Sequence, residues 1–546
     1  MIRDSRQIGA GATVQAETCI IGAGPAGLTL ALELAAQGRK VLLLEAGDFR
    51  DYEARDALAA PAPGFRYGAA TGIVMRQRFG GNANAWMVRT PEGGDFVRFA
   101  AFQAADFEPR AATGNESWPF RAADLLADEQ RAAQLWKISR PGPAAGDILP
   151  DPGHGLVHAV YQFPNAQTVT RDFQNAVQAS PDITLLLNAI VTRIEFEGRR
   201  AVRAVVATAP GKAFQVEAAT FVAAAGTLSA CRLLFNSPTA AGHAPGNSGD
   251  ALGRYLMDHP CVLGGVFYPA DLSMMERFKA YDIRRTGADV SMTHLVLSDD
   301  RLRKGDLLAL GTHFFPRESS WRWNKAESDR RIDAIVSAAE MRRAVERRKM
   351  PERRDIVTFL AGLDGVFAHF IRRSRAMQTS MLKGGWSWQE GASERYSVFE
   401  IVQSAEQAPH RENRVFLTGE KDALGRPRIS VDWEFDEADE QKIIAAQKLV
   451  EDGIAASGLG RIDHARPDGK IRLLTHSSSH QIGGLRMGTD PATSVTDGNG
   501  RVHGTENLYV AGAGLFPTGS YANPTWLISV LAVRLARHLA KRGNAA

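Results

Sequence analysis

Cysteine is scarce in this chain: its 546 residues include only Cys19, Cys231 and Cys261, which have neither disulfide-framework nor metal-site spacing. Long apolar runs are also missing, since no stretch approaches the roughly 18 apolar residues of a membrane span. The formal charge of +4 is small for this length and gives no indication of nucleic-acid binding. Residues 1–15 contain no long apolar core, so we expect no secretory signal and a cytoplasmic protein.

The first fifty residues follow a pattern of strand, glycine turn, helix and strand. The pattern consists of Thr18–Ile21, then Gly22, Gly24 and Gly27, then a helix over Leu28–Gln37, then Val41–Leu44 followed by Glu45. Glycine lets the backbone approach a pyrophosphate at the helix N-terminus, and the carboxylate accepts hydrogen bonds from ribose hydroxyls. The pattern predicts dinucleotide binding. It favours FAD over NAD only mildly, because a long excursion follows Glu45.

His480 and Asn523 are the candidates for chemistry near the end of the chain. His480 opens the stretch His480–Gly488, and Asn523 stands in Tyr521–Thr525. A neutral imidazole can accept the proton of a hydroxyl group while an amide holds the oxygen. If His480 and Asn523 meet at one site next to a hydride acceptor, the pair suits oxidation of an alcohol. A histidine in isolation is more often structural, and we interpret the nearby His476 as a solvated side chain.

Seven motifs, in order along the chain, resemble the glucose-methanol-choline (GMC) oxidoreductase family. They are Thr18–Gly27, Arg78–Trp86, Ser117–Pro119, Ala223–Leu234, Leu252–Pro260, the segments of Glu406–Asp432, and Asn507–Thr518 with Asn523–Thr525. A set of seven in the family's order is more specific than any one motif. The loop form of Arg78–Trp86 is most similar to that of pyranose oxidase and glycoside-oxidising members.

The resemblance implies a role for each matching position. His480 would be the catalytic base and Asn523 its partner, while His259 would serve packing or hydrogen bonding. The cofactor implied is FAD. The residues expected to bind it are Gly22, Gly24, Pro25, Ala26, Gly27, Glu45, Gly80, Gly81, Asn84, Ala85, Val191, Gly226, Gly512, Ala513, Asn523, Pro524 and Thr525.

Two departures from the family pattern qualify this expectation. Members of the pyranose oxidase type carry a histidine before the loop tryptophan that bonds covalently to the flavin. Here that position is Ala85, before Trp86, and no histidine precedes His154. We therefore predict noncovalent FAD. Gly512 stands where many members carry an acid, which leaves the local cofactor contact to backbone N–H groups. No metal site is expected.

The function implied is oxidation of an alcohol to a carbonyl, with hydride passing to flavin N5 and electrons then passing to dioxygen or another acceptor. The motif forms favour a small-molecule sugar, glycoside or aminoglycoside, including oxidation at C3 of a glycoside. Three alternatives stay open: a non-sugar alcohol, a flavin-containing lyase of the hydroxynitrile-lyase type, and a flavin-binding protein without catalysis.

The fold class expected is α/β, with an α+β second domain. A Rossmann-like FAD-binding domain would be assembled from the discontinuous segments 1–110, 150–260 and 471–546, with 111–149 as a connecting or lid segment. Residues 261–470 would form a substrate domain with an antiparallel sheet and helices. Within these domains the patterns predict a hairpin over Thr192–Val205, a helix over Asp436–Ser457 and a closing helix over 525–541.

The basic insertion at about 317–375 does not follow from the resemblance. Arg317–Asp355 holds twelve basic and eight acidic residues, and an apolar run, Ile356–Ile371, comes next. We interpret it as a helical insertion with a solvated face; a lid, an oligomer contact, a basic docking surface and membrane-surface attachment are alternatives. Four tryptophans could stack on a sugar, although tryptophans are more often core residues. They are Trp321, Trp323, Trp386 and Trp388.

Overall fold

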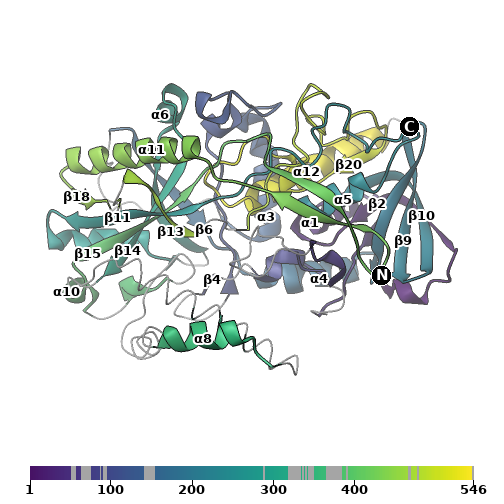
Figure 1. The fold of residues 1–546 in the computed structure, drawn as a ribbon, viewed down its shortest axis with the longest axis horizontal. Helices are drawn as coiled ribbons and strands as arrows, with labels where there is room; N and C mark the ends of the chain where they lie inside the picture. Colours follow the sequence, from purple (N-terminus) through teal and green to yellow (C-terminus); the bar gives the residue numbers. More distant parts are fainter. Residues whose placement is uncertain are drawn as a thin grey trace.

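The structure is a computed structural model. It describes residues 1–50, 57–62, 75–85, 88–89, 95–139, 154–286, 289–317, 334, 337–338, 341, 350–363, 384–388, 391–464, 466, 469–475 and 479–543. Two eight-stranded sheets form the two ends of an elongated molecule, and both chain termini lie at the end that holds the first sheet (Figure 1). Each sheet has its own hydrophobic core.

The first sheet has the order β1-β7-β3-β2-β10-β9-β8, with β20 beside β10. Its strands are β1 (Ile2–Asp4), β2 (Thr13–Ile21), β3 (Val41–Leu44), β7 (Ile183–Leu187), β8 (Ile190–Glu197), β9 (Arg200–Ala209), β10 (Lys212–Ala223) and β20 (Leu508–Val510). The pairs from β1 to β10, and β20 with β10, are parallel, whereas β8, β9 and β10 pair antiparallel. The helices on this side of the molecule are α1 (Pro25–Ala36), α3 (Leu126–Trp136), α4 (Phe173–Ala179), α5 (Thr227–Phe235) and α12 (Thr525–Gly543). This mixed sheet with helices confirms the expected Rossmann-like α/β class.

The second sheet is antiparallel and has the order β12-β13-β14-β15-β11-β18, with β6 beside β13 and β19 beside β11. Its strands are β6 (Leu156–Gln162), β11 (Cys261–Pro269), β12 (Arg284–Thr286), β13 (Asp289–Leu297), β14 (Leu310–Arg317), β15 (Val398–Ala405), β18 (Gly460–Asp463) and β19 (Arg472–Thr475). Helix α11 (Glu437–Ala456) runs along it (Figure 1). Shorter elements are α6 (Asp299–Lys304), α8 (Arg353–Ala361), α10 (Ala392–Arg395), β4 (Val88–Arg89) and β5 (Asp95–Phe96).

Local sequence patterns located several elements well. The predicted hairpin is β8 with β9, and the predicted helix at 436–457 is α11, whose N-cap Asp436 accepts a hydrogen bond from the backbone of Asp439. The first helix was expected from Leu28 but begins at Pro25, because proline fits the first turn, where its missing N–H has no partner to lose.

Other features of the chain differ from expectation. Residues Arg414–Lys421 (β16) and Pro427–Asp432 (β17) resemble part of the substrate-domain sheet, yet they form a separate two-stranded sheet. Val415 and Ile429 of this hairpin are buried in the core of the first sheet. The division into domains stays a prediction: β6 and β19 fall in segments assigned to the FAD-binding domain, although both pair within the second sheet.

Two predicted surface or connecting segments can be followed in part. In the connecting segment 111–149, α3 packs on α12, with buried Trp136 donating to Ser529 Oγ at 3.0 Å. In the basic insertion, α8 buries none of its residues and stands apart from both sheets (Figure 1). Trp321, Trp323 and most of the insertion lie outside the described residues. None of the described helices combines the length and apolar character that a membrane crossing needs.

Candidate active site

A cavity lies at the carboxyl ends of the parallel strands of the first sheet. Ile21 ends β2, Leu44 ends β3, and Ala224 and Ala511 follow β10 and β20; all four line the cavity. Ligands of open α/β sheets bind at this edge, because the loops there leave a crevice between neighbouring strands and helices. His480 lines the same cavity.

Three glycines leave room in this cavity for a ligand. A Cβ atom built on Gly24, Gly226 or Gly512 would meet no protein atom within 4 Å, and all three residues line the cavity. Gly24 is also the N-cap of α1 and offers no side-chain cap, so the helix presents its first backbone N–H groups to this space. Such a cradle suits a pyrophosphate, which the N-terminal end of a helix dipole attracts.

The other two glycines of the first motif serve packing. A Cβ atom on Gly27 would lie 2.0 Å from the carbonyl oxygen of Gly22, and one on Gly22 would lie 2.6 Å from the carbonyl oxygen of Ala224. Gly22 also has a φ of +111°, in the range that favours glycine. These contacts let α1 approach β2 and β10 closely, which brings the helix N-terminus to the cavity.

Glu45 stands at the end of β3 where a ribose would bind. Its carboxylate is buried and accepts hydrogen bonds at 2.9 Å from the backbone N–H groups of Ala23 and Gly47. These two bonds orient the carboxylate, which lines the cavity and can accept hydrogen bonds from ribose hydroxyls. The cavity therefore offers both features expected for FAD binding: a cradle for the pyrophosphate and a carboxylate for the ribose.

The structure brings His480 and Asn523 together. The Asn523 Nδ2 atom lies 3.1 Å from Nε2 of His480. The other ring nitrogen of His480, Nδ1, lies 3.0 Å from Nδ1 of His259. The carboxylate of Asp258 accepts hydrogen bonds from the backbone N–H groups of His259 and His480, at 2.6 and 3.1 Å. These contacts fix the position of the imidazole from both sides.

Burial keeps the His480 ring neutral. Burial, then the neighbouring His259, then the positive charge of Arg98 hold the pKa of His480 well below 6.5. Burial also lowers the pKa of His259. A neutral imidazole with an unprotonated nitrogen can act as a proton acceptor, so this environment suits a base.

A buried ionic cluster holds the loop that carries Asn523. Ser520 donates its backbone N–H to Glu406 at 3.1 Å and its hydroxyl to Asp106 at 2.7 Å. Arg110 lies between these carboxylates, 2.6 Å from Glu406 and 3.6 Å from Asp106, and its side chain is fully buried. Ser520 has a φ of +54°, which is costly for a residue other than glycine and persists because these bonds hold it.

Most residues predicted to bind the cofactor line the cavity. They are Gly22, Gly24, Pro25, Ala26, Glu45, Gly81, Val191, Gly226, Gly512, Ala513 and Pro524, together with His480. The lining does not include Gly27, Gly80, Asn84, Ala85, Asn523 or Thr525. Asn84 has a local role instead, because its amide donates to the carbonyl oxygens of Phe79 and Gly81 and closes the loop. Trp86 and His476 lie outside the described residues.

Sequence reasoning missed the segment just before the Gly80–Gly81 loop. The cavity is lined by Met75, Arg76 and Gln77, and also by Asn82. The side-chain oxygen of Asn82 accepts a hydrogen bond from the backbone N–H of Arg76 at 2.9 Å. Their proximity to the Gly-Gly motif was the only available signal. Trp386, a candidate for sugar stacking, is 1% exposed and packs against Phe399 and Tyr396, so it is a core residue.

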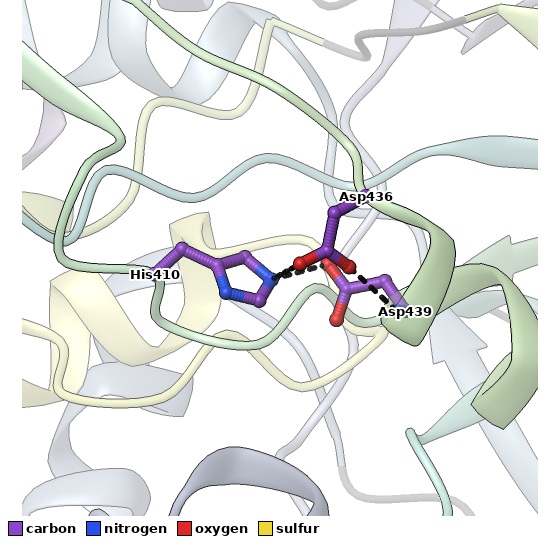
Figure 2. Close-up of side chains that lie close together, drawn as sticks. All are labelled: His410, Asp436 and Asp439. Atoms are coloured by element: carbon purple, nitrogen blue, oxygen red, sulfur yellow. Dashed lines mark hydrogen bonds and ion pairs between the residues drawn. The ribbon is translucent and has the colours of Figure 1, made fainter.

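One group in the described part of the chain could offer three metal-ligating atoms: His410, Asp436 and Asp439 (Figure 2). His410 Nε2 lies 2.8 Å from Asp439 and 3.4 Å from Asp436, and the two aspartates lie at the N-terminus of α11. The positive end of a helix dipole repels a cation, and the imidazole itself supplies a partner for the buried Asp439. We interpret the group as an ion pair that fastens the 406–413 loop to α11.

Comparisons with known proteins agree with this geometry. The GMC oxidoreductase model matches residues 409–532, and the FAD dependent oxidoreductase model matches residues 17–245. The two matches cover the segments that supply His480, Asn523 and the glycine cradle. The matches assign residues 409–532 to the GMC oxidoreductases and residues 17–245 to the FAD dependent oxidoreductases. Members bind FAD, and FAD is the cofactor that this cavity fits.

Relatives of this chain include two enzymes named for sugar-like substrates. Paromamine 6'-oxidase of Streptomyces fradiae is 34% identical over 132 residues, 24% of each chain. C-glycoside 3-oxidase of Microbacterium trichothecenolyticum is 32% identical over 127 residues, 23% of this chain and 24% of the relative. The matches thus span about a quarter of those relatives' lengths. Pyridoxine 4-oxidase from Mesorbium loti shares the fold, with a TM-score of 0.53 at 16% identity over 96% of this chain and 99% of that one.

Proposed function

We propose that this protein is an FAD-dependent oxidoreductase that converts an alcohol of a sugar, glycoside or aminoglycoside into a carbonyl. The observation that carries the proposal is the contact of His480 Nε2 with the Asn523 amide beside the glycine-cradled cavity. The names of the partly matched relatives support a sugar-like substrate. Dioxygen or another acceptor would take the electrons afterwards.

The chain's own residues supply binding and proton transfer. Gly24, Gly226 and Gly512 would cradle the cofactor, and Glu45 would hold its ribose. FAD, when bound, supplies the hydride acceptor. A substrate hydroxyl between His480 and Asn523 would give its proton to Nε2 of His480 and accept a hydrogen bond from the amide of Asn523. The amide would hold the alkoxide oxygen as the proton leaves.

The decisive experiment is an anaerobic titration of the FAD-loaded protein with monosaccharides, glycosides, aminoglycosides and simple alcohols, followed by the visible flavin absorbance. We expect bleaching by a sugar-containing class and reoxidation on readmission of air if dioxygen is the acceptor. Bleaching only by simple alcohols would overturn the substrate class. Turnover of a cyanohydrin without bleaching would favour the lyase alternative.

The base is tested by His480→Ala, with His243→Ala as the matched control because His243 is an exposed histidine. We expect His480→Ala to slow anaerobic flavin reduction by about 10²- to 10⁴-fold, the usual contribution of a general base. The His243→Ala protein should reduce its flavin at the wild-type rate. Equal rates for all three proteins would refute the assignment of His480.

A further inference from the structure

His259 lies against the imidazole of His480, although the sequence motif assigns it only packing or hydrogen bonding. The two rings meet edge to face, with centroids 5.0 Å apart and planes at 78°. Their Nδ1 atoms are 3.0 Å apart, and His259 is 1% exposed. A nitrogen–nitrogen contact of this length requires one ring to donate a proton and the other to accept it.

The carbonyl oxygen of Gly519 determines where the protons of the two imidazoles lie. His259 Nε2 lies 3.1 Å from the carbonyl oxygen of Gly519, which can only accept. Nε2 of His259 therefore carries a proton. Because burial lowers the pKa of His259, the ring is neutral and its Nδ1 is an acceptor. His480 must then donate from its own Nδ1.

Nε2 of His480 then carries no proton. A neutral imidazole carries one proton, and Nδ1 of His480 holds it. The Asn523 amide, 3.1 Å from Nε2, has N–H groups that donate to this lone pair. Every contact in the series from Gly519 to Asn523 is thus satisfied by one assignment of protons.

We propose that His259 is a positioning residue that holds His480 in the tautomer whose Nε2 can accept the substrate proton. This inference rests on the proposed function, because a defined lone pair at Nε2 matters only if His480 is the base. The other neutral tautomer would present an N–H to the substrate hydroxyl and could not remove its proton. His259 does not itself line the cavity, and it acts through His480, which does.

The surrounding charges are compatible with a neutral pair. Asp258 and Glu406 favour the protonated form of His259, but burial outweighs them, and its pKa stays below 6.5. Arg98 and His259 both disfavour a charge on His480. The carboxylate of Asp258 accepts hydrogen bonds from the backbone N–H groups of His259 and His480, and it thereby orients both residues.

The test uses two variants of similar shape, His259→Asn and His259→Leu, as FAD-loaded proteins. The amide introduced by His259→Asn can place its oxygen near the position of Nδ1 and accept the proton of His480, whereas the leucine side chain cannot. We expect the leucine variant to lose at least about tenfold in anaerobic flavin reduction, as substitutions behind a functional side chain do, and the asparagine variant to recover most of it. Both should keep the wild-type FAD content.

The tautomer itself is measured by ¹⁵N NMR of histidine-labelled protein, with His480 assigned by comparison with His480→Gln. The expected wild-type spectrum has a protonated Nδ1 and an unprotonated Nε2 on His480, and the leucine variant a mixture. A wild-type proton on Nε2, or a leucine variant with wild-type rate and tautomer, would overturn the proposal. If the leucine variant fails to fold, the asparagine variant and the wild-type spectrum still decide.

The two hypotheses fail in different ways. If His480→Ala leaves flavin reduction unchanged, the proposed function loses its base. If His480→Ala abolishes reduction while His259→Leu changes neither rate nor tautomer, only the positioning role is wrong.

Discussion

At the scale of single residues, the chemistry converges on Nε2 of His480. The Asn523 amide reaches it from one side, and His259 and Asp258 fix the ring from the other. The resemblance predicted the pairing of His480 with Asn523, because both lie in recognisable motifs. The contact with His259 was not predictable in the same way, since the two histidines are 221 residues apart and only the folded chain fixes which nitrogens meet.

The lowered pKa of His480 predicts the pH profile of flavin reduction. A base whose pKa lies well below 6.5 stays unprotonated from about pH 6 to 8, so the reduction rate should be flat there and fall only in stronger acid. Arg98→Met removes a positive charge that lowers this pKa, so its acidic limb should move to higher pH. Stopped-flow reduction across pH measures both profiles. A wild-type limb centred near 6.5 would contradict the expectation.

At the scale of elements, what the sequence predicted well was local. The helix α11 has its capping aspartate and its periodicity within one stretch, and the β8–β9 hairpin has its glycine turn between two alternating strands. Strand pairing between distant segments was harder, because no local pattern records the partner. The pairing of β6 with β13 belongs to this class. The packing of the β16–β17 hairpin against the core of the first sheet is likewise a contact between distant segments.

The ionic cluster beneath the Asn523 loop predicts the effect of Arg110→Met. The change leaves Asp106 and Glu406 buried without their cation, which costs about 3–5 kcal/mol and should lower the thermal midpoint by several degrees. Burial already raises the pKa of Asp106 to about 7, and Arg110 opposes that rise. Because the pKa of Asp106 is raised in the folded protein, its protonation stabilises the fold in acid. This contribution is lost as the pH rises through about 7. The variant should therefore be less stable at pH 8 than at pH 6.

The control for this prediction is Arg121→Met, since the Arg121 side chain is 84% exposed and its loss should leave the midpoint unchanged. Adding Glu406→Gln to Arg110→Met should restore part of the lost stability, because one unpaired charge is removed. A midpoint for Arg110→Met equal to that of wild type at both pH values would refute the account of the cluster.

At the scale of the whole molecule, the cavity joins parts of the chain that are far apart in sequence. Gly24 comes from the first turn, Gly226 from the segment after β10, and Gly512 from the segment after β20. A ligand that contacts all three stabilises the arrangement of the whole first sheet, because it binds the folded chain and not the unfolded one. A cofactor bound in this cavity would therefore help to hold the distant segments together.

Removal of FAD should lower the thermal midpoint, and added FAD should raise it with concentration. At a free concentration about 100-fold above the dissociation constant, the gain is about 2.7 kcal/mol. Gly24→Val tests the cause: Gly24 has a φ of −80°, and its Cβ would enter open cavity space, so the variant should fold but neither bind FAD nor respond to it. Gly27→Val, whose Cβ would lie 2.0 Å from a backbone oxygen, should fail to fold. Because the attachment is predicted to be noncovalent, FAD should pass an ultrafiltration membrane after denaturation; retention with the chain would contradict this.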